Sequence, residues 1–177
     1  KMIKYRDWLK TNGMTRKGNY QVQISLDYIE EWVNERISRK YGLQLCPDFQ
    51  PGHVWNEKQQ VDFISFLIRG GISQPIYFNH PGWMNSFEGE FVLVDGLQRL
   101  TTILRFVRNE IAVDGLYYKD FDIVGRAIDI TININNLKTR KEVLRWYIEM
   151  NDGGTPHSKD EIERVRKMVE SESGSFY

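Results

Sequence analysis

The sequence predicts a single α/β domain, of the mixed α+β kind, with a small mixed sheet flanked by helices. Three observations support this class. The chain has 177 residues, of which 41% are hydrophobic and 13% aromatic, so it can bury one hydrophobic core without the disulfides or metal ions that smaller domains need. Residues 127–134 alternate isoleucine with polar side chains, as a strand with one buried face does. Elsewhere apolar residues recur every three or four positions, which is the spacing of amphipathic helices.

The same spacing predicts where the helices lie. We expect helices over residues 26–40, 56–69, 97–109 and 139–149, and a last one opened by a Ser158–Glu161 capping box. Ser25 is placed to cap the first helix, and Gly42 to end it. Asn56 and Gln59 have the spacing of a capping box at the start of the second helix.

Short apolar runs predict two more strands besides residues 127–134. These are residues 75–78 and 91–94, and the second is apolar enough to be buried on both faces. A sharp turn at Asp95 and Gly96 then joins this strand directly to the next helix.

The chain divides into three expected parts, a basic N-terminal arm (residues 1–20), the domain (21–170) and a polar tail (171–177). Its 24 basic and 24 acidic residues exclude a uniformly basic polyanion binder, but they leave a local basic face open. The single cysteine, Cys46, cannot form an internal disulfide, and no Cys/His pair has zinc spacing. No apolar run reaches the ~20 residues of a membrane span. We therefore expect a soluble, cytoplasmic protein with no membrane partner.

The segment from Leu93 to Thr102 is the densest group of residues that could carry chemistry. An apolar strand ends in an acid, a glycine permits a tight turn, and a helix starts at once. Backbone N–H groups at such a helix start attract anions, above all phosphate. Arg99 can fork onto phosphate oxygens, and Asp95 can hold Mg²⁺ or accept a hydroxyl proton. The alternative is an ordinary capped turn with a surface arginine and no ligand.

Other charged and aromatic residues have a structural and a functional interpretation each. Basic residues follow the motif and cluster again further along, at Arg105, Arg108, Lys138, Arg140 and Lys141. They are either solvated helix faces or, together with the basic arm, a track for a DNA backbone.

Trp83 lies in a Pro-Gly-rich loop, so we expect it to be the exposed tryptophan, placed to stack on a base. Glu88 and Glu90 would form a metal cluster with Asp95, unless residues 88–90 are simply a turn before the strand.

Four segments resemble one family in the same order along the chain. Leu93–Thr102 resembles the Asp-Gly-Gln-Gln-Arg motif of the N-terminal domain family of GmrSD-type restriction enzymes. Residues 47–55, 59–76 and 149–158 resemble the segments that precede and follow that motif in the family. The resemblance covers roughly residues 43–165 and implies a ParB/sulfiredoxin-like fold.

The resemblance also implies a nucleoside triphosphate (ATP, GTP or CTP) and Mg²⁺ as cofactors. Carried over to this chain, it places the following residues at the nucleotide: Asp95, Gly96, Gln98, Arg99, Thr101 and Thr102 at the phosphates and metal, Gln50 and Trp55 lining the pocket, and Asn151, Gly153 and Gly154 closing over it. Leu97 and Pro51 depart from the pattern, because the family has a glutamine and an arginine there. No cysteine lies beside Asp95, so sulfiredoxin-type repair is not expected.

The leading functional hypothesis is phosphoryl transfer on or at DNA. The enzyme would be a kinase for a hydroxyl on a modified base, or an NTPase switch. The alternative is a non-catalytic module that senses a nucleotide or modified DNA and acts through a partner protein; a purely structural interaction domain is the third. The sequence has no His-Asn-His nuclease pattern, so we expect this chain not to cut DNA by itself. A compact form of this kind suggests a phage protein working in the host cytoplasm.

Overall fold

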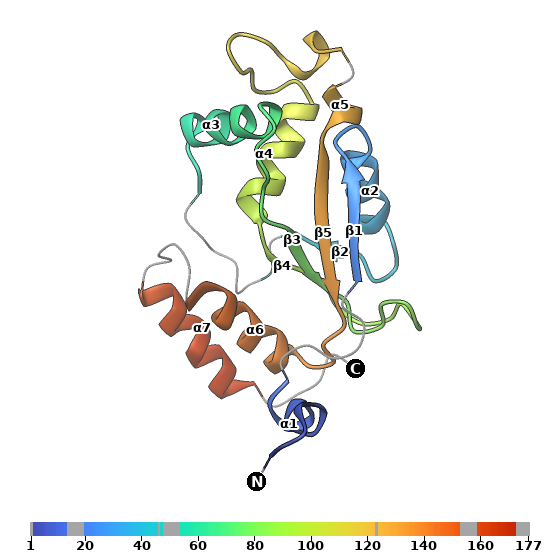
Figure 1. Cartoon of the computed structure of the whole chain (residues 1–177), viewed down its shortest axis with the longest axis vertical. Coiled ribbons are helices and arrows are strands. Elements are labelled where there is room, and N and C mark those ends of the chain that lie inside the picture. Colours follow the sequence, from blue (N-terminus) through green and yellow to red (C-terminus); the bar gives the residue numbers. More distant parts are fainter. Residues whose placement is uncertain are drawn as a thin grey trace.

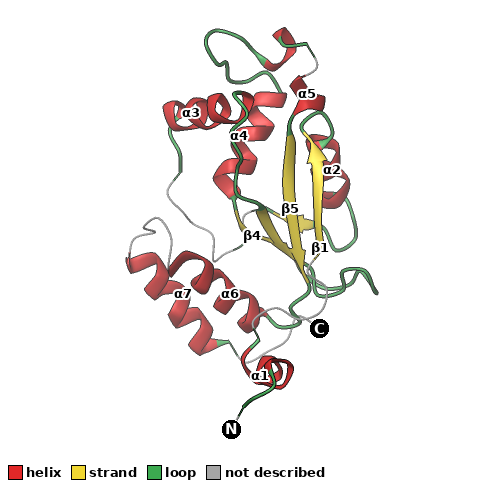
Figure 2. Ribbon diagram, in the orientation of Figure 1, coloured by secondary structure: helices red, strands yellow, loops and turns green. Residues whose placement is uncertain are grey.

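A computed structural model describes residues 2–13, 20–45, 47, 54–122, 124–152 and 159–172. Within these residues the fold is an α/β arrangement of helices around one mixed sheet (Figures 1 and 2). The helices are α1 (Tyr5–Asn12), α2 (Ile29–Ile37), α3 (Glu57–Ile68), α4 (Leu97–Val107), α5 (Val124–Ala127), α6 (Arg140–Asp152) and α7 (Lys159–Ser171), with a 3-10 turn at Tyr118–Asp120. The strands are β1 (Tyr20–Ser25), β2 (Leu43–Gln44), β3 (Ile76–Asn79), β4 (Phe91–Asp95) and β5 (Asp129–Asn135).

The sheet has the strand order β1-β5-β3-β4-β2. The β1–β5 and β3–β4 pairs are antiparallel, whereas the β5–β3 and β4–β2 pairs are parallel. β4 therefore lies beside the short edge strand β2, and β1 forms the opposite edge. This mixed sheet flanked by helices confirms the predicted fold class.

Helices cover the two faces of the sheet unequally (Figure 1). On one face, α2, α3 and α4 pack apolar side chains such as Ile29, Ile64 and Ile103 against Phe78 and Ile132; this is the first cluster. On the other face, α6 and α7 cover β4 with a second cluster that includes Val92, Val94, Leu144 and Val165. Burial on both faces explains why β4 is apolar at four consecutive positions.

Periodicity and capping predicted several of these elements correctly. In β5, Ile130, Ile132 and Ile134 are at most 2% exposed, while Asp129 on the alternate face is exposed. The predicted capping box opens α3, where the Asn56 side chain accepts from the Gln59 backbone N–H and the Gln59 side chain accepts from Asn56 in return. The Ser158 capping box lies outside the described residues.

The start of the domain differs from the prediction. Ser25 is the last residue of β1 rather than a helix cap, and α2 begins at Ile29. β1 pairs with β5 along its whole length, from Tyr20 opposite Ile134 onward, and this pairing overrides the helical spacing that begins near Leu26. Gly42 lies beyond the end of α2, which is capped by Ser38.

Trp83 is also placed differently from the prediction. It is only 7% exposed, because Tyr20, His80, Phe87 and Phe91 pack around its ring. The expected exposure of Trp83 is therefore wrong.

Helix α1 lies in the predicted N-terminal arm, and none of its residues is buried. Within the part of the chain that the structure describes, no helix is both long and apolar enough to cross a bilayer.

Candidate functional site

A β-bulge at the end of β4 decides where the Asp95 carboxylate points. Leu93 pairs with Phe78, but Asp95 rather than Val94 pairs with Tyr77, so β4 contains one extra residue here. Strict alternation would place Asp95 on the same face as Leu93, in the first cluster. The bulge instead places it beside Tyr77, whose ring packs with the second cluster and lies edge-on to Trp146 at 5.9 Å. Bulges commonly re-aim a side chain in this way next to functional sites.

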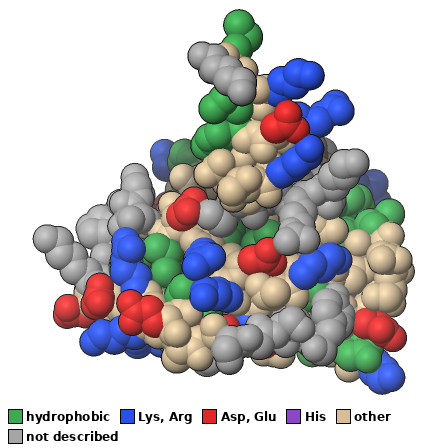
Figure 3. All heavy atoms as spheres, turned by 90° about the horizontal axis from the view of Figure 1, so that it is seen from below, with side chains coloured by type: hydrophobic (Ala, Val, Ile, Leu, Met, Phe, Trp, Pro, Cys, Tyr) green, Lys and Arg blue, Asp and Glu red, His purple; other side chains and the backbone are tan. Residues whose placement is uncertain are grey.

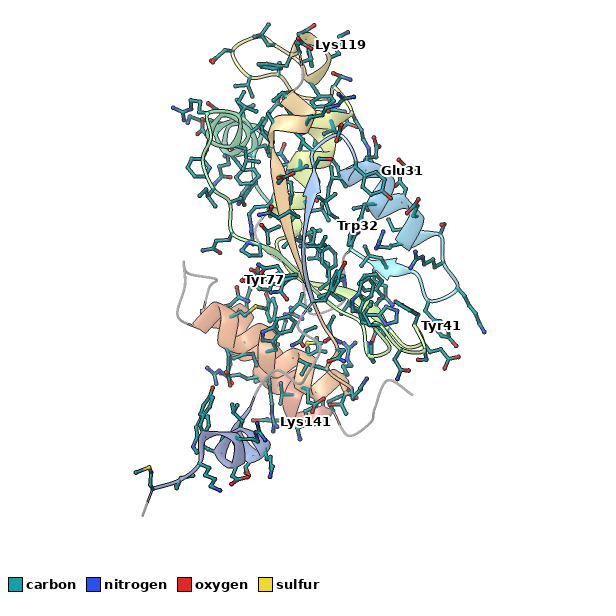
Figure 4. The ribbon with its side chains drawn as sticks, turned by 45° about the vertical axis from the view of Figure 1, so that its right-hand side comes forward. Glu31, Trp32, Tyr41, Tyr77, Lys119 and Lys141 are labelled. Atoms are coloured by element: carbon teal, nitrogen blue, oxygen red, sulfur yellow. The ribbon has the colours of Figure 1, made fainter. Side chains whose placement is uncertain are left out.

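Residues of α6 and α7 share the electrostatic environment of Asp95. Burial, together with the negative charges of Glu161 and Asp95 and against the opposing charge of Arg164, raises the pKa of Tyr147 on α6 to about 12. These groups come from β4 and from the helix pair α6 and α7, which follows much later in the sequence. Figure 4 shows Tyr77 between the sheet and α6, at the centre of this region. We call Tyr77, Asp95, Tyr147 and Glu161 the Asp95 site.

Arg99 is turned back onto the strand that precedes its helix. Its Nη2 lies 3.3 Å from Asp95 Oδ2, and its Nη1 donates to the carbonyls of Pro75, at 3.0 Å, and Gln74. The side chain is 14% exposed, and this burial lowers the pKa of Arg99, while the Asp95 charge opposes the shift. The guanidinium remains a cation at neutral pH. It compensates the charge of Asp95 and fixes the start of α4 to the segment before β3.

Gly96 forms the turn between Asp95 and α4. Its φ of +107° lies in the left-handed region that favours glycine. A Cβ here would lie 3.2 Å from both Arg99 Nη2 and Ile76 Cγ2. Gly96 is also the N-cap of α4, and no described side chain caps the helix. The N–H groups of the first helical turn have no intrahelical acceptor, so this helix start is chemically suited to an anion.

The other motif residues on α4 have contacts of their own. Gln98 Oε1 accepts from the Trp55 backbone N–H at 3.0 Å, which ties the segment before α3 to α4. The half-buried Trp55 ring packs edge-on against Phe63 at 5.3 Å. Thr102 is fully buried and donates to the Gln98 carbonyl at 2.7 Å, whereas Thr101 is exposed. Gln98 and Trp55 thus lie together, as the resemblance implies, while Thr102 is turned into the fold.

Asn151 lies on the last turn of α6 rather than in a loop. Its Nδ2 donates to the carbonyl of Tyr147 at 2.7 Å, so it is one helical turn from the Asp95 site. Three further residues with an expected role, Gln50, Gly153 and Gly154, lie outside the described residues, as does the departure at Pro51.

The predicted DNA-binding residues lie in two separate places. Arg105 and Arg108 are at the C-terminal end of α4, near α3, whereas Lys138, Arg140 and Lys141 are at the start of α6, at the other end of the molecule (Figure 1). Arg105 donates to Gln60 Oε1, and Arg108 pairs with Glu30 at 2.5 Å. The structure does not bring the two groups together.

Two of the three basic residues at the start of α6 make contacts within the chain. Lys138 donates to the Pro81 carbonyl, and Arg140 lies 3.8 Å from Glu90 and 3.4 Å from Glu172. Lys141 makes no ion pair with a described residue.

A protein-only metal cluster is absent from the described part of the chain, where no three His, Cys, Asp or Glu residues are grouped to hold a metal ion. Glu88 and Glu90 therefore do not join Asp95, and Glu90 pairs with Arg140 instead. In nucleotide sites Mg²⁺ is usually held by one or two carboxylates and the substrate phosphates. Asp95 is the side chain at this site that suits that role.

Sequence reasoning missed Tyr77 and Tyr147. Tyr77 reaches Asp95 only because of the bulge, and Tyr147 only because α6 packs on β4. One signal was present: Tyr147 is four residues before Asn151, and residues at that spacing share a helix face.

A strand that ends in an acid, a glycine turn and an uncapped helix start form a strand–turn–helix unit in an α/β domain, and the chemistry of this unit suits an anion such as phosphate. The family model of the GmrSD restriction endonuclease, N-terminal domain, matches residues 29–129, which is more than half of the chain. The chain therefore belongs to this family, and the resemblance of its motifs is confirmed. Searches among curated proteins and among solved structures found no match. Membership of a restriction endonuclease family indicates a role related to DNA restriction or modification.

Proposed function

We propose that the chain transfers a phosphoryl group from a nucleoside triphosphate, on or at DNA, at the Asp95 site. The observation that carries this proposal is the uncapped start of α4 directly after Asp95. Backbone N–H groups and the helix dipole together favour phosphate there. The bulge adds a carboxylate that faces away from the first cluster.

The expected reaction is an in-line displacement at the γ-phosphorus. The bond from the γ-phosphorus to the bridging oxygen breaks as the acceptor oxygen bonds to phosphorus, and the nucleoside diphosphate leaves. The N–H groups at the start of α4 donate to phosphate oxygens, and Arg99 holds the Asp95 carboxylate in place. Asp95 either contacts the metal or takes the acceptor proton. Mg²⁺, when bound, would neutralise charge on the phosphate oxygens.

The acceptor defines two forms of this enzyme. Water as acceptor gives an NTPase switch, and a hydroxyl on a modified base gives a DNA kinase. The family supports an acceptor on or near DNA. ATP, GTP and CTP are each candidate donors.

The test follows labelled γ-phosphate from ATP, GTP or CTP with Mg²⁺, in the presence of plain or hydroxymethylated DNA. We expect release of phosphate or its transfer to DNA. Asp95→Asn should reduce the rate by about 10²-fold or more. Asp62→Asn is the matched control, since Asp62 is an exposed aspartate that pairs with Lys58 on α3. Equal rates in wild type and Asp95→Asn would reject the site.

A second candidate is a binding module without turnover, and two contacts favour it. Arg99 is engaged by Asp95 and two carbonyls, so it is not directed at a transferred phosphoryl group. Leu97, which replaces a family glutamine, packs against the first cluster and adds no polar group. Saturable nucleotide binding that depends on Asp95, with no release of phosphate from any donor, would favour this candidate.

A further inference from the structure

A second concave site lies at the edge of the sheet opposite β4. It is a pocket of about 300 Å³ between β1, α2 and the loop that carries Trp83, and its principal walls are Tyr20, Val22, Tyr28, Trp32, Arg36 and Trp83. This volume is at the lower end of the range for small-ligand sites. The strands β5 and β3 separate β1 from β4, so three strand spacings, about 14 Å, lie between β1 and β4. The pocket is therefore separate from the Asp95 site.

Four of the nine residues that line this pocket are aromatic, and Gln23, Ile24 and Ser25 of β1 complete its wall. Trp32 and Trp83 are 4% and 7% exposed and form its floor, and the Tyr20 ring lies 5.5 Å from that of Trp83. Tyr20 and Tyr28 are more than a third exposed, so they stand at the mouth. Figure 4 shows Trp32 between α2 and β1. Such walls suit a flat ligand that stacks.

Two residues that line the pocket each have a buried N–H donor with no hydrogen-bond partner among the described residues. The donors are Arg36 Nε and Trp83 Nε1. The Arg36 guanidinium is held in place, because it lies 3.9 Å above the Trp32 ring and its Nη1 donates to the Trp32 carbonyl at 3.0 Å. Buried polar groups are nearly always paired, and an unpaired one is costly. A ligand that fits must therefore bring acceptors.

The charge around the pocket favours a ligand attached to phosphate. Burial lowers the pKa of Arg36, and the nearby Arg39 adds to this effect, but an arginine stays protonated at neutral pH. Glu35 lies 3.8 Å from Arg36 and offsets part of the charge. Arg39 and Lys138 also act together on His80, which packs against Trp83. Arg36 thus lines the pocket, and Arg39 and Lys138 add positive charge near its residues.

We propose that this pocket binds an unpaired nucleobase. The base would stack on the aromatic walls, and its ring nitrogen or carbonyl oxygen would accept from Arg36 Nε and Trp83 Nε1. An aliphatic ligand would leave both donors unpaired, and a small carboxylate would leave the aromatic walls uncovered. A nucleobase has a flat apolar face and acceptors at its edge, so it satisfies both features. It comes either from a free nucleotide or from a base displaced out of a DNA strand.

Quenching of tryptophan fluorescence tests the proposal, with EDTA present and without any triphosphate, so that turnover at the Asp95 site plays no part. The probes are a short single-stranded DNA, an abasic strand of the same length, and the nucleoside monophosphates. We expect the base-bearing strand to bind at least about tenfold more tightly than the abasic one. Arg36→Met should weaken that binding about tenfold, and Trp83→Phe, which keeps the wall but removes the donor, several-fold.

Matched controls separate the pocket from general effects. Arg126→Met removes an 85%-exposed arginine, and Trp8→Phe changes a tryptophan on the exposed helix α1; both should bind as wild type does. Thermal unfolding checks each variant, and if Arg36→Met is unfolded, Trp83→Phe decides alone. Saturable binding of monophosphates would identify the free nucleotide as the source, and binding of strands alone would identify DNA.

Two results would overturn the proposal. One is equal binding of base-bearing and abasic strands, which indicates a purely electrostatic contact. The other is binding that Asp95→Asn abolishes but Arg36→Met and Trp83→Phe leave unchanged, because that binding belongs to the Asp95 site. Loss of turnover at the Asp95 site alone would bear on the proposed function and not on the pocket.

Discussion

His80 is a buried histidine whose neutral form the fold requires. Its Nδ1 accepts from the Gly82 backbone N–H at 3.2 Å, and its ring lies 4.9 Å from that of Phe91. Burial lowers the pKa of His80 to about 4, and the charges of Arg39 and Lys138 contribute. Between pH 6.5 and 4 the unfolded chain therefore binds a proton that the folded chain does not. The free energy of unfolding must fall as the pH drops through this window.

Because His80 takes up a proton in the unfolded chain, we expect the free energy of unfolding to fall by about 2 kcal/mol between pH 7 and pH 5. Denaturant unfolding at the two pH values measures the loss. His80→Asn is the comparison, since an amide oxygen can still accept from Gly82 but does not titrate. The wild type should lose more stability than this variant over the same pH change. Parallel losses would show that His80 is not held neutral.

Gly96 gives a second prediction at the scale of one residue. Gly96→Ala forces a side chain into a left-handed conformation and brings its Cβ to 3.2 Å from Ile76 and Arg99. Gly70→Ala is the matched control, because Gly70 also has a positive φ, of +92°, but open space around its Cβ position. Both should lose about 1 kcal/mol for the backbone, and Gly96→Ala about 1–2 kcal/mol more for crowding. Equal losses in denaturant unfolding would mean that the turn relaxes.

At the scale of one element, α3 depends on its capping box. Asn56→Ala removes the acceptor for the Gln59 backbone N–H and should cost about 1 kcal/mol of unfolding free energy. Asn34→Ala, an exposed substitution in α2, should be neutral or slightly stabilising, because alanine is the better helix former. Urea unfolding measures both variants. A loss at Asn34 as large as at Asn56 would refute the role of the cap.

Elements that residues close in the sequence specify could be predicted. Elements that depend on contacts with distant parts of the chain could not. The Asn56–Gln59 box and the alternating isoleucines of β5 are local signals, and both elements were found. β1 has only a short alternation, with Val22 and Ile24 directed inward, and it becomes a strand because β5 supplies its partner. Trp83 sits in a loop that resembles a surface turn, yet aromatic neighbours distant in sequence enclose it.

The candidate site follows the same rule. Asp95 and Gly96 could be singled out from the sequence because an acid and a glycine between strand and helix have a local meaning. That Asp95 lies beside Tyr77 and acts electrostatically on Tyr147 depends on a bulge, and strand alternation predicts the opposite face. Tyr20, Arg36 and Trp83 share a pocket although more than 60 residues separate Trp83 from Tyr20. No sequence spacing connects them.

At the scale of the whole molecule, 24 basic and 24 acidic residues give a net charge of zero, and what matters for DNA binding is how these charges are distributed. On the face seen in Figure 3, basic and acidic side chains both spread over the surface in small groups, and neither sign covers the whole face. Several arginines are compensated across elements, as in the pairs Arg108–Glu30 and Arg140–Glu90. Association with DNA would therefore depend on a few basic residues that such pairs leave available.

Lys141 is the residue among the predicted DNA-binding group that best fits this condition. Lys138 and Arg140, which precede it, are bound within the chain, whereas Lys141 makes no ion pair with a described residue. If the start of α6 contacts the DNA backbone, the affinity should fall steeply with salt. Lys141→Ala should then reduce the slope of log K against log [salt] by about 0.9, the value of one duplex phosphate contact.

Fluorescence anisotropy with a labelled duplex at several salt concentrations measures that slope. Lys58→Ala is the matched control, since Lys58 is 84% exposed on α3 and pairs with Asp62. It should leave the slope unchanged, because a lysine that does not contact a phosphate displaces no counterion when the protein binds DNA. An affinity that does not vary with salt would exclude a basic contact of any kind. An unchanged slope in Lys141→Ala, with a reduced one in Arg108→Ala, would move the contact to the opposite end of the molecule, at α4.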